Sequence, residues 1–443
     1  MTDSTDYIIT PWEIEIHVQN LQPSDIEDIG TKKWLEFHKI LLLLNQQSVL
    51  EISTLREEAV KEWFISLKKL PVLIHEVIQI NIWKEYVFPL LIEINDEPTN
   101  TFMLHSVFFH EGVAASLLEN ILYHSDSAEA VADQAIDLID YAVNNLTNLL
   151  YNTTKEENAE NHENAQSCLM ELLKKKSDLD FDVSMKCVSI LRYMAEFADT
   201  LPLCAVSRML SIHDVPYLLT ELIEKQPWKK LNNDGKQMIY DGKWKTVDEN
   251  DQDRICRVEG QIWIGLREIL LNPKCAPHYE ITEFRMSKLV KLQKYLHESV
   301  LDQIAPLIEL KRWLCQLSVM SQPSNAQKPV IVELLPEIRS SVLAKHNRKW
   351  KKLAKHQSKS LFNNDIQYIK SMAQVLSDAY DLDKLECVEP KKCFACQAPA
   401  SKRCSKCKEA WYCGRECQVK DWTKHKEICE KIISNKEAYG LKD

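Results

Sequence analysis

The sequence predicts an all-α protein, in which a long body of packed helices is followed by a small zinc-binding module. Only 8 of the 443 residues are glycine, whereas the phosphate turns of doubly wound α/β folds and the hairpins of β-sandwiches both depend on glycine. Apolar residues recur at helical spacing through most of the chain. In addition, 7 of the 14 cysteines lie within residues 393–429. These observations favour helices with short connections and a metal site.

Composition and charge limit the class of protein. The formal net charge is −10 and the pI is about 5.8, which disfavours an affinity of the whole chain for nucleic acid or anionic membranes. The longest apolar runs, such as 40–44, are far shorter than the roughly 20 residues that span a bilayer. No basic segment followed by an apolar one opens the chain. We therefore expect a soluble protein that is not secreted.

The N-terminal segment and the helical body differ in pattern. Residues 1–30 form a mixed segment, in which the alternating apolar side chains of 13–18 predict a short edge strand. Helical periodicity dominates from residue 31 to 320. Within this body, apolar residues of 136–150 and of 187–198 each fall on one face of a helix.

An internal repeat supports the helical interpretation. Residues 69–83 and 214–228 align without a gap, with a proline near the start of each segment and a tryptophan at its end. Proline suits the first turn of a helix because its φ is already fixed there. A looser third copy covers 111–122. The aligned prolines are Pro71 and Pro216, and the aligned tryptophans are Trp83 and Trp228.

The repeat resembles those of armadillo/HEAT solenoids, in which stacked helices share one continuous core. The resemblance implies an armadillo/HEAT-like body over 31–320. An irregular helical domain is the alternative, since only two copies are clear.

Polar segments divide the chain further. Residues 152–166 are almost devoid of apolar groups and predict a disordered loop. Residues 237–247 predict a β-hairpin that turns at an Asp-Gly pair. Residues 321–329 contain two prolines and read as a linker, and 330–386 predict C-terminal helices. The stretch 345–359 holds seven Lys/Arg and no acid; we interpret it as a solvated helix face, with an RNA or acidic-partner patch as the alternative.

The cysteine cluster carries the most specific chemistry in the sequence. Its spacing is Cys-x2-Cys-x7-Cys-x2-Cys-x5-Cys-x3-Cys-x7-His-x3-Cys. These eight ligands are of the types that zinc favours, and two ions with four ligands each would use all of them. Four protein ligands leave no open position for water, so the sites are structural. Spacing alone also permits the ligands to pair sequentially. The eight are Cys393, Cys396, Cys404, Cys407, Cys413, Cys417, His425 and Cys429.

The spacing over 393–429, together with Tyr412-Cys413 and Lys420-Asp421-Trp422, resembles the MYND zinc finger. A C-terminal tail, 430–443, follows. The resemblance implies that the ligands interleave: Cys393, Cys396, Cys413 and Cys417 hold one zinc ion, and Cys404, Cys407, His425 and Cys429 hold the other. MYND fingers bind short proline-rich peptides, and by resemblance Ser401, Gln418 and Trp422 line the peptide groove. Packing of Trp422 against the finger's own helix is the alternative.

MYND fingers also accompany SET-type lysine methyltransferases, which makes an enzyme the competing hypothesis. Asn161-His162 does not continue as the SET cofactor motif, and no His-Glu dipeptide is followed by the second histidine of a zinc protease. Neither a Gly-x-Ser-x-Gly elbow nor a Walker A lysine occurs. We predict that the protein is not an enzyme and has no catalytic residues. The cysteines outside the finger are predicted to be small core residues; they are Cys168, Cys187, Cys204, Cys256, Cys275, Cys315 and Cys387.

Nearly the whole chain resembles a MYND-containing family of axonemal dynein arm assembly factors. The segments that carry this resemblance are 81–91, 189–201, 207–224, 260–266, 348–357 and 400–422. The resemblance implies a non-enzymatic cytoplasmic scaffold or co-chaperone adaptor for the preassembly of axonemal dynein arms, and hence for ciliary motility. A nuclear corepressor-type adaptor that binds proline-rich peptides through the finger is the alternative.

The same resemblance implies the partners and the location. The finger would dock a leucine-rich-repeat assembly factor, and the body would meet Hsp90-system chaperones and co-chaperones, with dynein chains as clients. Neither nucleic acid nor a membrane span is expected. The protein would be cytoplasmic, concentrated near the centrosome, the centriolar satellites and the ciliary base.

Overall fold

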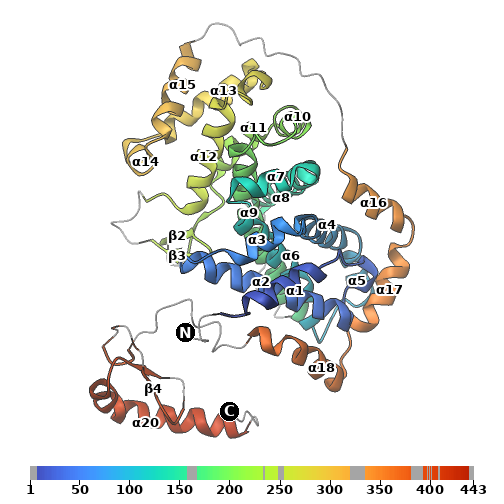
Figure 1. Ribbon diagram of the computed structural model, residues 1–443, viewed down its shortest axis with the longest axis vertical. Helices are drawn as coiled ribbons and strands as arrows, with labels where there is room; N and C mark the ends of the chain where they lie inside the picture. Colours follow the sequence, from blue (N-terminus) through green and yellow to red (C-terminus); the bar gives the residue numbers. More distant parts are fainter. Residues whose placement is uncertain are drawn as a thin grey trace. The chain divides into compact units, whose positions relative to one another are not determined.

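The computed structural model describes the chain except for residues 1–6, 157–166, 233–234, 248–253, 320–334, 381–392, 397, 399, 401, 408–409 and 439–443 (Figure 1). The chain divides into two compact units. The larger, called the helical body here, comprises Ile9–Val49 and Glu57–Ala379. The smaller includes Tyr380–Asp443 and therefore the finger. The predicted linker 321–329 lies outside the described residues.

Most of the helical body is α-helix. In chain order its first helices are α1 (Pro11–Asn20), α2 (Lys32–Ser53), α3 (Ala59–Ser66), α4 (Leu70–Tyr86), α5 (Phe88–Ile94), α6 (Phe102–Ile121), α7 (Ser125–Ala130), α8 (Ala135–Glu156) and α9 (Cys168–Glu196). They are followed by α10 (Leu203–Ser207), a π-helix (Arg208–Ile212), α11 (Val215–Lys225), α12 (Arg257–Leu271), α13 (Glu283–Lys291), α14 (Glu298–Gln303), α15 (Leu307–Val319), α16 (Glu337–His346), α17 (Trp350–Leu361) and α18 (Ile366–Leu376). Of the predicted loop 152–166, residues 152–156 belong to α8 and the others lie outside the described residues.

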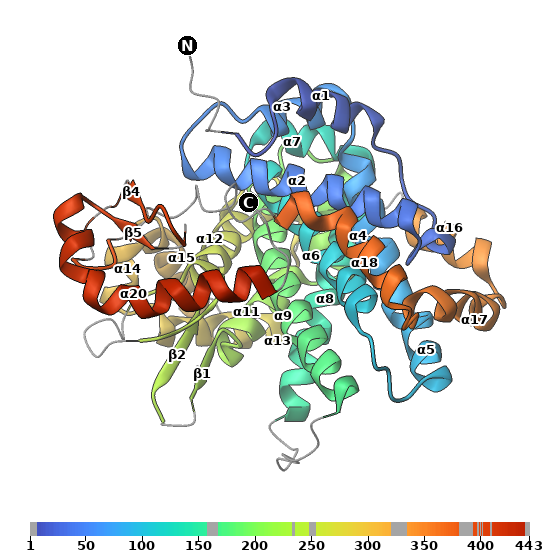
Figure 2. The ribbon, with the colours of Figure 1, turned by 90° about the horizontal axis from the view of Figure 1, so that it is seen from below.

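The core of the body lies between helices that pack in chain order, with other helices between them in the sequence. Helices α4, α6, α9, α12 and α15 each pack against the next in this order, and α8 also packs against α9 (Figure 2). Four tryptophans are completely buried in this body: Trp34, Trp83, Trp228 and Trp263. The all-α prediction is confirmed, while the armadillo/HEAT assignment stays a prediction. Among the described helices, none combines the length and the low polarity that a bilayer-spanning segment needs.

The edge strand expected at 13–18 is wrong, because this segment lies within α1. Thr10 and Glu13 form a capping box, in which the Thr10 backbone N–H donates to Glu13 Oε2 at 2.8 Å. Pro11 occupies the first helical turn, where its missing N–H costs nothing. Ile14 and Val18 are both buried. The buried residues of this segment are therefore four positions apart, as on one face of a helix, and not two apart as in a strand.

Two of the three proposed repeat copies begin as predicted. Pro71 and Pro216 each lie in the first turn of a helix, α4 and α11 respectively. A residue with positive φ precedes each helix, Lys68 at 54° and Asp214 at 46°, which turns the chain sharply before the proline. The third copy is wrong, since residues 111–121 continue α6 without a break.

A small antiparallel sheet interrupts the helices. Its strands β1 (Lys229–Leu231), β2 (Gln237–Tyr240) and β3 (Trp244–Thr246) follow in sequence order, with Ile239 opposite Lys229 on one side and Lys245 on the other. The hairpin expected at 237–247 is β2–β3, and its turn contains Gly242 at a φ of 74°. The added strand β1 was not expected from the sequence.

The last three helices of the body return to its N-terminal part. Helix α16 packs against α4, and α17 packs against α5 (Figures 1 and 2). The start of α16 is capped by Asp137, whose oxygens accept from the backbone N–H groups of Glu337 and Ile338 at 3.3 and 2.9 Å. The helices expected over 330–386 are therefore present as α16, α17 and α18 within the described part of this range.

Candidate metal centre

The finger is built on a short hairpin and one long helix. Strand β4 (Lys402–Arg403) pairs antiparallel with β5 (Trp411–Tyr412), and α20 (Arg415–Ala438) follows. Backbone hydrogen bonds shape the turns that carry the paired cysteines: the Cys393 N–H donates to the Ala398 carbonyl at 2.7 Å, and the Cys404 N–H donates to the Ala410 carbonyl at 2.8 Å. Because α20 extends to Ala438, most of the predicted tail 430–443 is the continuation of this helix.

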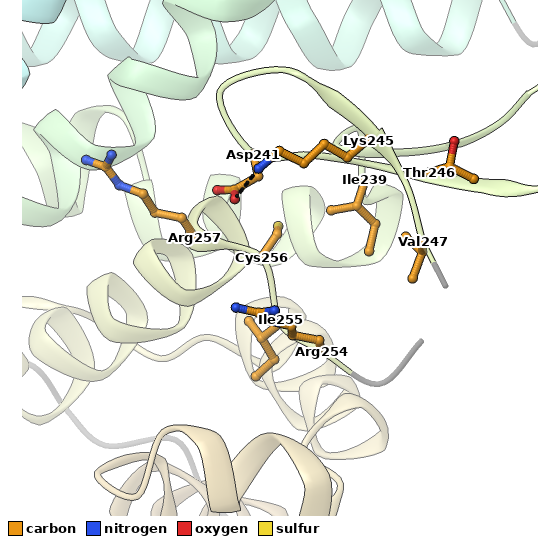
Figure 3. A pocket seen from close by; sticks show the side chains of 9 residues that line it. All are labelled: Ile239, Asp241, Lys245, Thr246, Val247, Arg254, Ile255, Cys256 and Arg257. Atoms are coloured by element: carbon orange, nitrogen blue, oxygen red, sulfur yellow. Dashed lines mark hydrogen bonds and ion pairs between the residues drawn. The ribbon is translucent and has the colours of Figure 1, made fainter. Parts of the chain in front are cut away.

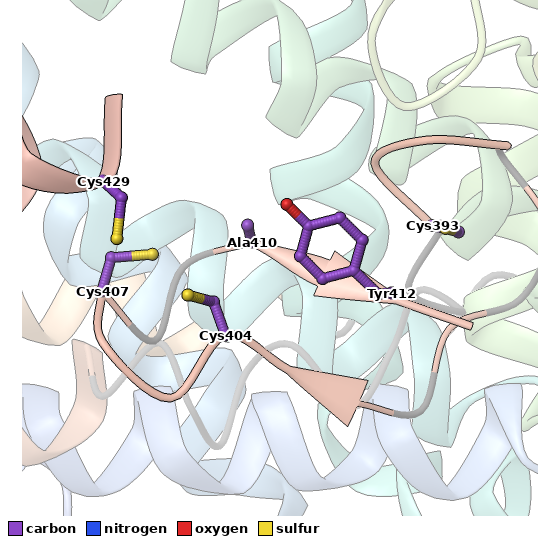
Figure 4. Packing of buried hydrophobic residues seen from close by; sticks show 6 residues of the cluster. All are labelled: Cys393, Cys404, Cys407, Ala410, Tyr412 and Cys429. Atoms are coloured by element: carbon purple, nitrogen blue, oxygen red, sulfur yellow. The ribbon is translucent and has the colours of Figure 1, made fainter. Parts of the chain in front are cut away.

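The fold gathers the eight predicted ligands into two sets of four. Cys393, Cys396, Cys413 and Cys417 form one set. Cys404, Cys407, His425 and Cys429 form the other, and in each set all ligand atoms lie within 4.8 Å of one another. This is the interleaved arrangement that the resemblance implies, and not the sequential one. Figure 4 shows the Cys404, Cys407 and Cys429 side chains pointing toward one another, apart from Cys393.

The spacing of the ligand atoms suits zinc. The Sγ atoms of Cys396 and Cys413 lie 3.5 Å apart, and Cys407 Sγ lies 3.5 Å from His425 Nε2. Zn–S bonds of about 2.3 Å in a tetrahedron place neighbouring sulfurs about 3.8 Å apart. All eight donors are sulfur or imidazole nitrogen, and each set is complete with four. The finger therefore fits two structural zinc ions.

The two sets differ in exposure. All four ligands of the second set are buried, whereas Cys396 and Cys413 of the first set are exposed. The Cys413 thiol donates a hydrogen bond to Cys417 Sγ, and this bond together with that to Cys396 raises the pKa of Cys413 to about 12. Desolvation opposes ionisation of Cys393, but backbone N–H groups of Cys413 and Cys396 outweigh it and lower its pKa to about 6. Because zinc binds thiolates, filling this site must release protons.

Aromatic rings surround the one histidine ligand. The rings of Tyr412 and Trp422 both have their centroids 6.0 Å from that of His425, and the ring of Phe394 lies at 6.4 Å. The Tyr412 hydroxyl donates to Asp421 Oδ2 at 2.8 Å, which ties β5 to α20. The Phe394 side chain is 57% exposed. Sequence reasoning missed Phe394, although its position inside the first Cys-x2-Cys turn placed it beside a metal site.

The structure describes two of the three residues expected in the peptide groove. Gln418 and Trp422 lie four residues apart on α20, and both are half-buried. The Trp422 ring also meets a cation, since Lys406 Nζ lies 5.8 Å from its centroid. Ser401 lies outside the described residues. Trp422 thus packs beside a ligand histidine and still presents part of its indole to solvent.

A second candidate site is a pocket of about 380 Å³ between the β2–β3 hairpin and the start of α12 (Figure 3). Lys245 in this pocket is paired with Asp241 at 3.3 Å. Cys256 Sγ caps α12 by accepting from the Glu259 N–H at 3.5 Å, and burial raises its pKa to about 11. A neutral thiol that caps a helix is a poor nucleophile. Among the described residues, this pocket therefore assembles no recognisable catalytic pair.

The other cysteines only partly follow the core prediction. Cys187, Cys256 and Cys275 are buried, and burial raises the pKa of each thiol. Cys204 is half-buried. The prediction is wrong for Cys168 and Cys315, which are exposed, and Cys387 lies outside the described residues.

Comparison with known proteins agrees with this geometry. Residues 393–429 match the MYND finger family. The chain is 34% identical, over 96% of its own length and 99% of the relative's, to the zinc finger MYND domain-containing protein 10 homolog of Drosophila melanogaster. A shorter match is to human Protein CBFA2T2, at 25% identity over 26% of this chain and 18% of that protein. Another is to human Tudor domain-containing protein 1, at 35% identity over 12% of this chain and 5% of that protein. No solved structure matches.

Proposed function

The chain belongs to the zinc finger MYND domain-containing protein 10 family, and from this premise we propose that it is a non-enzymatic cytoplasmic scaffold for the preassembly of axonemal dynein arms. At the level of the family it is a protein-interaction adaptor that carries a MYND finger. The proposal adds the client, the dynein chains, and the chaperone partners of the Hsp90 system. It also adds a location near the centrosome, the centriolar satellites and the ciliary base.

The observation that carries the proposal is the placement of Gln418 and Trp422. They lie one helical turn apart on α20, and Trp422 packs beside the zinc ligand His425 with a ring separation of 6.0 Å. Zinc bound by His425 would therefore hold the position of this indole face, which remains half-exposed. Such a face suits the rings of a proline-rich peptide, which loses little entropy when it binds in its extended form. We assign this surface to the leucine-rich-repeat assembly factor.

The test is a quantitative pull-down with mass spectrometry from ciliating cells, comparing wild type with Trp422→Ala. Val419→Ala is the matched control, because Val419 is an exposed apolar residue on the same helix. Zinc content is measured for each variant, so that loss of the finger fold is not mistaken for loss of the surface.

We expect dynein chains and chaperones with wild type, and selective loss of one partner with Trp422→Ala but not with Val419→Ala. If wild type instead captures transcriptional regulators, the protein is a nuclear corepressor-type adaptor. If Trp422→Ala retains every partner and both zinc ions, the groove assignment is wrong and recognition belongs to the helical body.

A further inference from the structure

The basic stretch 345–359 acquires a definite geometry in the fold. No acidic residue occurs between Glu337 and Asp365, while eight lysines and arginines do. Arg339 pairs with Glu85, and Lys345 pairs with Asp25. The remaining cations form no ion pair with any residue that the structure describes. We call the four that lie on α17 the basic face: Lys351, Lys352, Lys355 and Lys359.

The opposite side of α17 is fixed to the body. Leu353, Ala354 and Leu361 are buried. Gln357 is buried as well, accepting from Trp83 Nε1 at 2.9 Å and donating to the Ile26 carbonyl at 2.7 Å. A helix held by an apolar face and two buried hydrogen bonds presents its outer face in a constant orientation.

The charges on that outer face form a line. Lys352, Lys355 and Lys359 are exposed and follow the spacing i, i+3 and i+7, which places them along one side of the helix. The line from Lys352 to Lys359 is about 10 Å long at the usual rise per residue. It faces directly away from the buried side. The arrangement is therefore a stripe and not a ring of solubilising charges.

The surroundings of the stripe favour protein over nucleic acid. Single-stranded RNA needs exposed rings on which bases stack. The one aromatic residue of the stretch, Trp350, instead stacks on Tyr86, with ring centroids 5.1 Å apart and planes 26° apart. None of the large exposed apolar residues found in the described chain lies in 345–359 to insert into a lipid surface.

We propose that the basic face of α17 is a docking surface for an acidic segment of a partner protein, one that presents glutamates or aspartates along one side of a helix. Charge complementarity provides the attraction. Because α17 is held rigidly on the body, its lysines stay at fixed positions opposite the acidic residues of the partner. This surface belongs to the helical body and not to the finger. A partner on the basic face should bind equally well when Trp422 is replaced.

The test uses the full-length protein and fluorescence polarisation of labelled peptides. The probe is an alanine-based helical peptide with glutamates at i, i+3, i+7 and i+10. A shuffled peptide of the same composition spreads its glutamates around the helix. A single-stranded oligouridylate of equal charge tests nucleic acid. The variant Lys352→Gln/Lys355→Gln/Lys359→Gln removes the stripe, and Lys174→Gln/Lys236→Gln/Lys243→Gln removes three exposed lysines elsewhere on the body.

We expect wild type to bind the one-sided peptide several-fold more tightly than the shuffled one, and this binding to weaken as salt rises. The stripe variant should lose about tenfold in affinity, as three exposed ion pairs would give, while the control variant loses less than about twofold. Equal losses in both variants, or equal binding of both peptides, would overturn the proposal in favour of diffuse attraction. Tighter, stripe-dependent binding of the oligouridylate would make the face a nucleic-acid surface instead. Circular dichroism checks that both variants fold.

Discussion

The helical body and the finger are stabilised by different chemistry. In the body, four completely buried tryptophans and many aliphatic side chains form a core that extends through successive helices. In the finger, the buried cluster consists of Cys393, Cys404, Cys407, Cys429, Ala410 and Tyr412. Four of these six are metal ligands. The body can therefore fold by removing apolar surface from water, whereas the finger replaces most of that contribution by zinc–ligand bonds.

Charge is also handled differently in the two regions. The body buries Lys84 between Glu111 and Asp180, and the Tyr141 hydroxyl donates to Glu111 at 2.7 Å. Desolvation works against the charged lysine, but the two carboxylates outweigh it and raise the pKa of Lys84. In the finger, the ligand thiolates are neutralised by zinc, or by protons when zinc is absent. The buried charges of the body are thus balanced by other side chains, whereas those of the finger are balanced by an ion that the chain must bind.

Removal of zinc should give the largest effect and should separate the two regions. We expect a strong chelator to unfold 393–429, because structural zinc contributes on the order of 10 kcal/mol or more in finger peptides. The body should keep its helical circular dichroism and its buried tryptophan fluorescence. Limited proteolysis after chelation should cut the finger first. Simultaneous loss of body structure would show that the finger's metal also holds the body.

Removal of one buried counter-charge should destabilise the body alone. Lys84→Met leaves Glu111 buried without its cation, and we expect a loss of about 3–5 kcal/mol in the free energy of unfolding. Urea titration followed by tryptophan fluorescence measures this loss. Lys175→Met is the control, since Lys175 pairs with Glu171 on the exposed surface of α9. A similar midpoint shift in both variants would mean that burial of the Lys84 cluster is unimportant.

Acid should weaken the body through Glu76. Burial opposes ionisation of this carboxyl, but hydrogen bonds with His110 and His75 outweigh it and lower its pKa from 4.5 to about 2. Because the folded-state pKa lies below the unfolded one, the carboxylate stabilises the fold above pH 4.5, and this contribution is lost as pH falls towards 2. It is worth about 3 kcal/mol at neutral pH.

The measurement is the unfolding free energy of wild type and Glu76→Gln between pH 7 and pH 2.5. The difference between the two proteins should shrink over the lower half of this range. A constant difference would show that Glu76 acts through packing and not through its charge. Zinc release, which is followed separately, should occur at higher pH, because its ligands take up protons more readily.

The smallest of these effects should come from removing the buried hydrogen bonds that hold α17 on the body. Gln357→Ala removes the partners of Trp83 Nε1 and of the Ile26 carbonyl, both buried, and should cost about 2 kcal/mol. Gln367→Ala on the exposed face of α18 should leave the unfolding midpoint unchanged. If Gln357→Ala is equally silent, α17 is held by its apolar contacts alone, and the constant orientation of the basic face must be re-examined by hydrogen exchange.

The sequence predicted the finger better than the details of the body. Ligand types and spacing identify a two-zinc module because tetrahedral coordination tolerates few alternatives, although spacing alone leaves the pairing open. The segment 13–18 shows why the body is harder. Its alternating residues fit a strand. Only the capping box formed by Thr10 and the presence of Pro11 in the first turn indicate a helix instead.

Tertiary contacts also escaped sequence reasoning. Gly112 in the third proposed copy marks no break, because α6 continues through it. The burial of Gln357 and the pairing of Lys84 with Glu111 join residues far apart in the chain, and no local pattern announces them. The exposure of Cys168 and Cys315 likewise depends on which helix face meets a neighbour.

The interleaved ligation has a consequence for how the finger is made. During synthesis the chain emerges from its N-terminal side, so Cys393, Cys396, Cys404 and Cys407 are available before Cys413. These first four thiolates can themselves enclose one zinc ion. In the native arrangement the two early pairs belong to different ions. A zinc ion bound by all four early thiolates would therefore have to exchange two of its ligands as α20 is completed, whereas a zinc ion bound after α20 has formed would not.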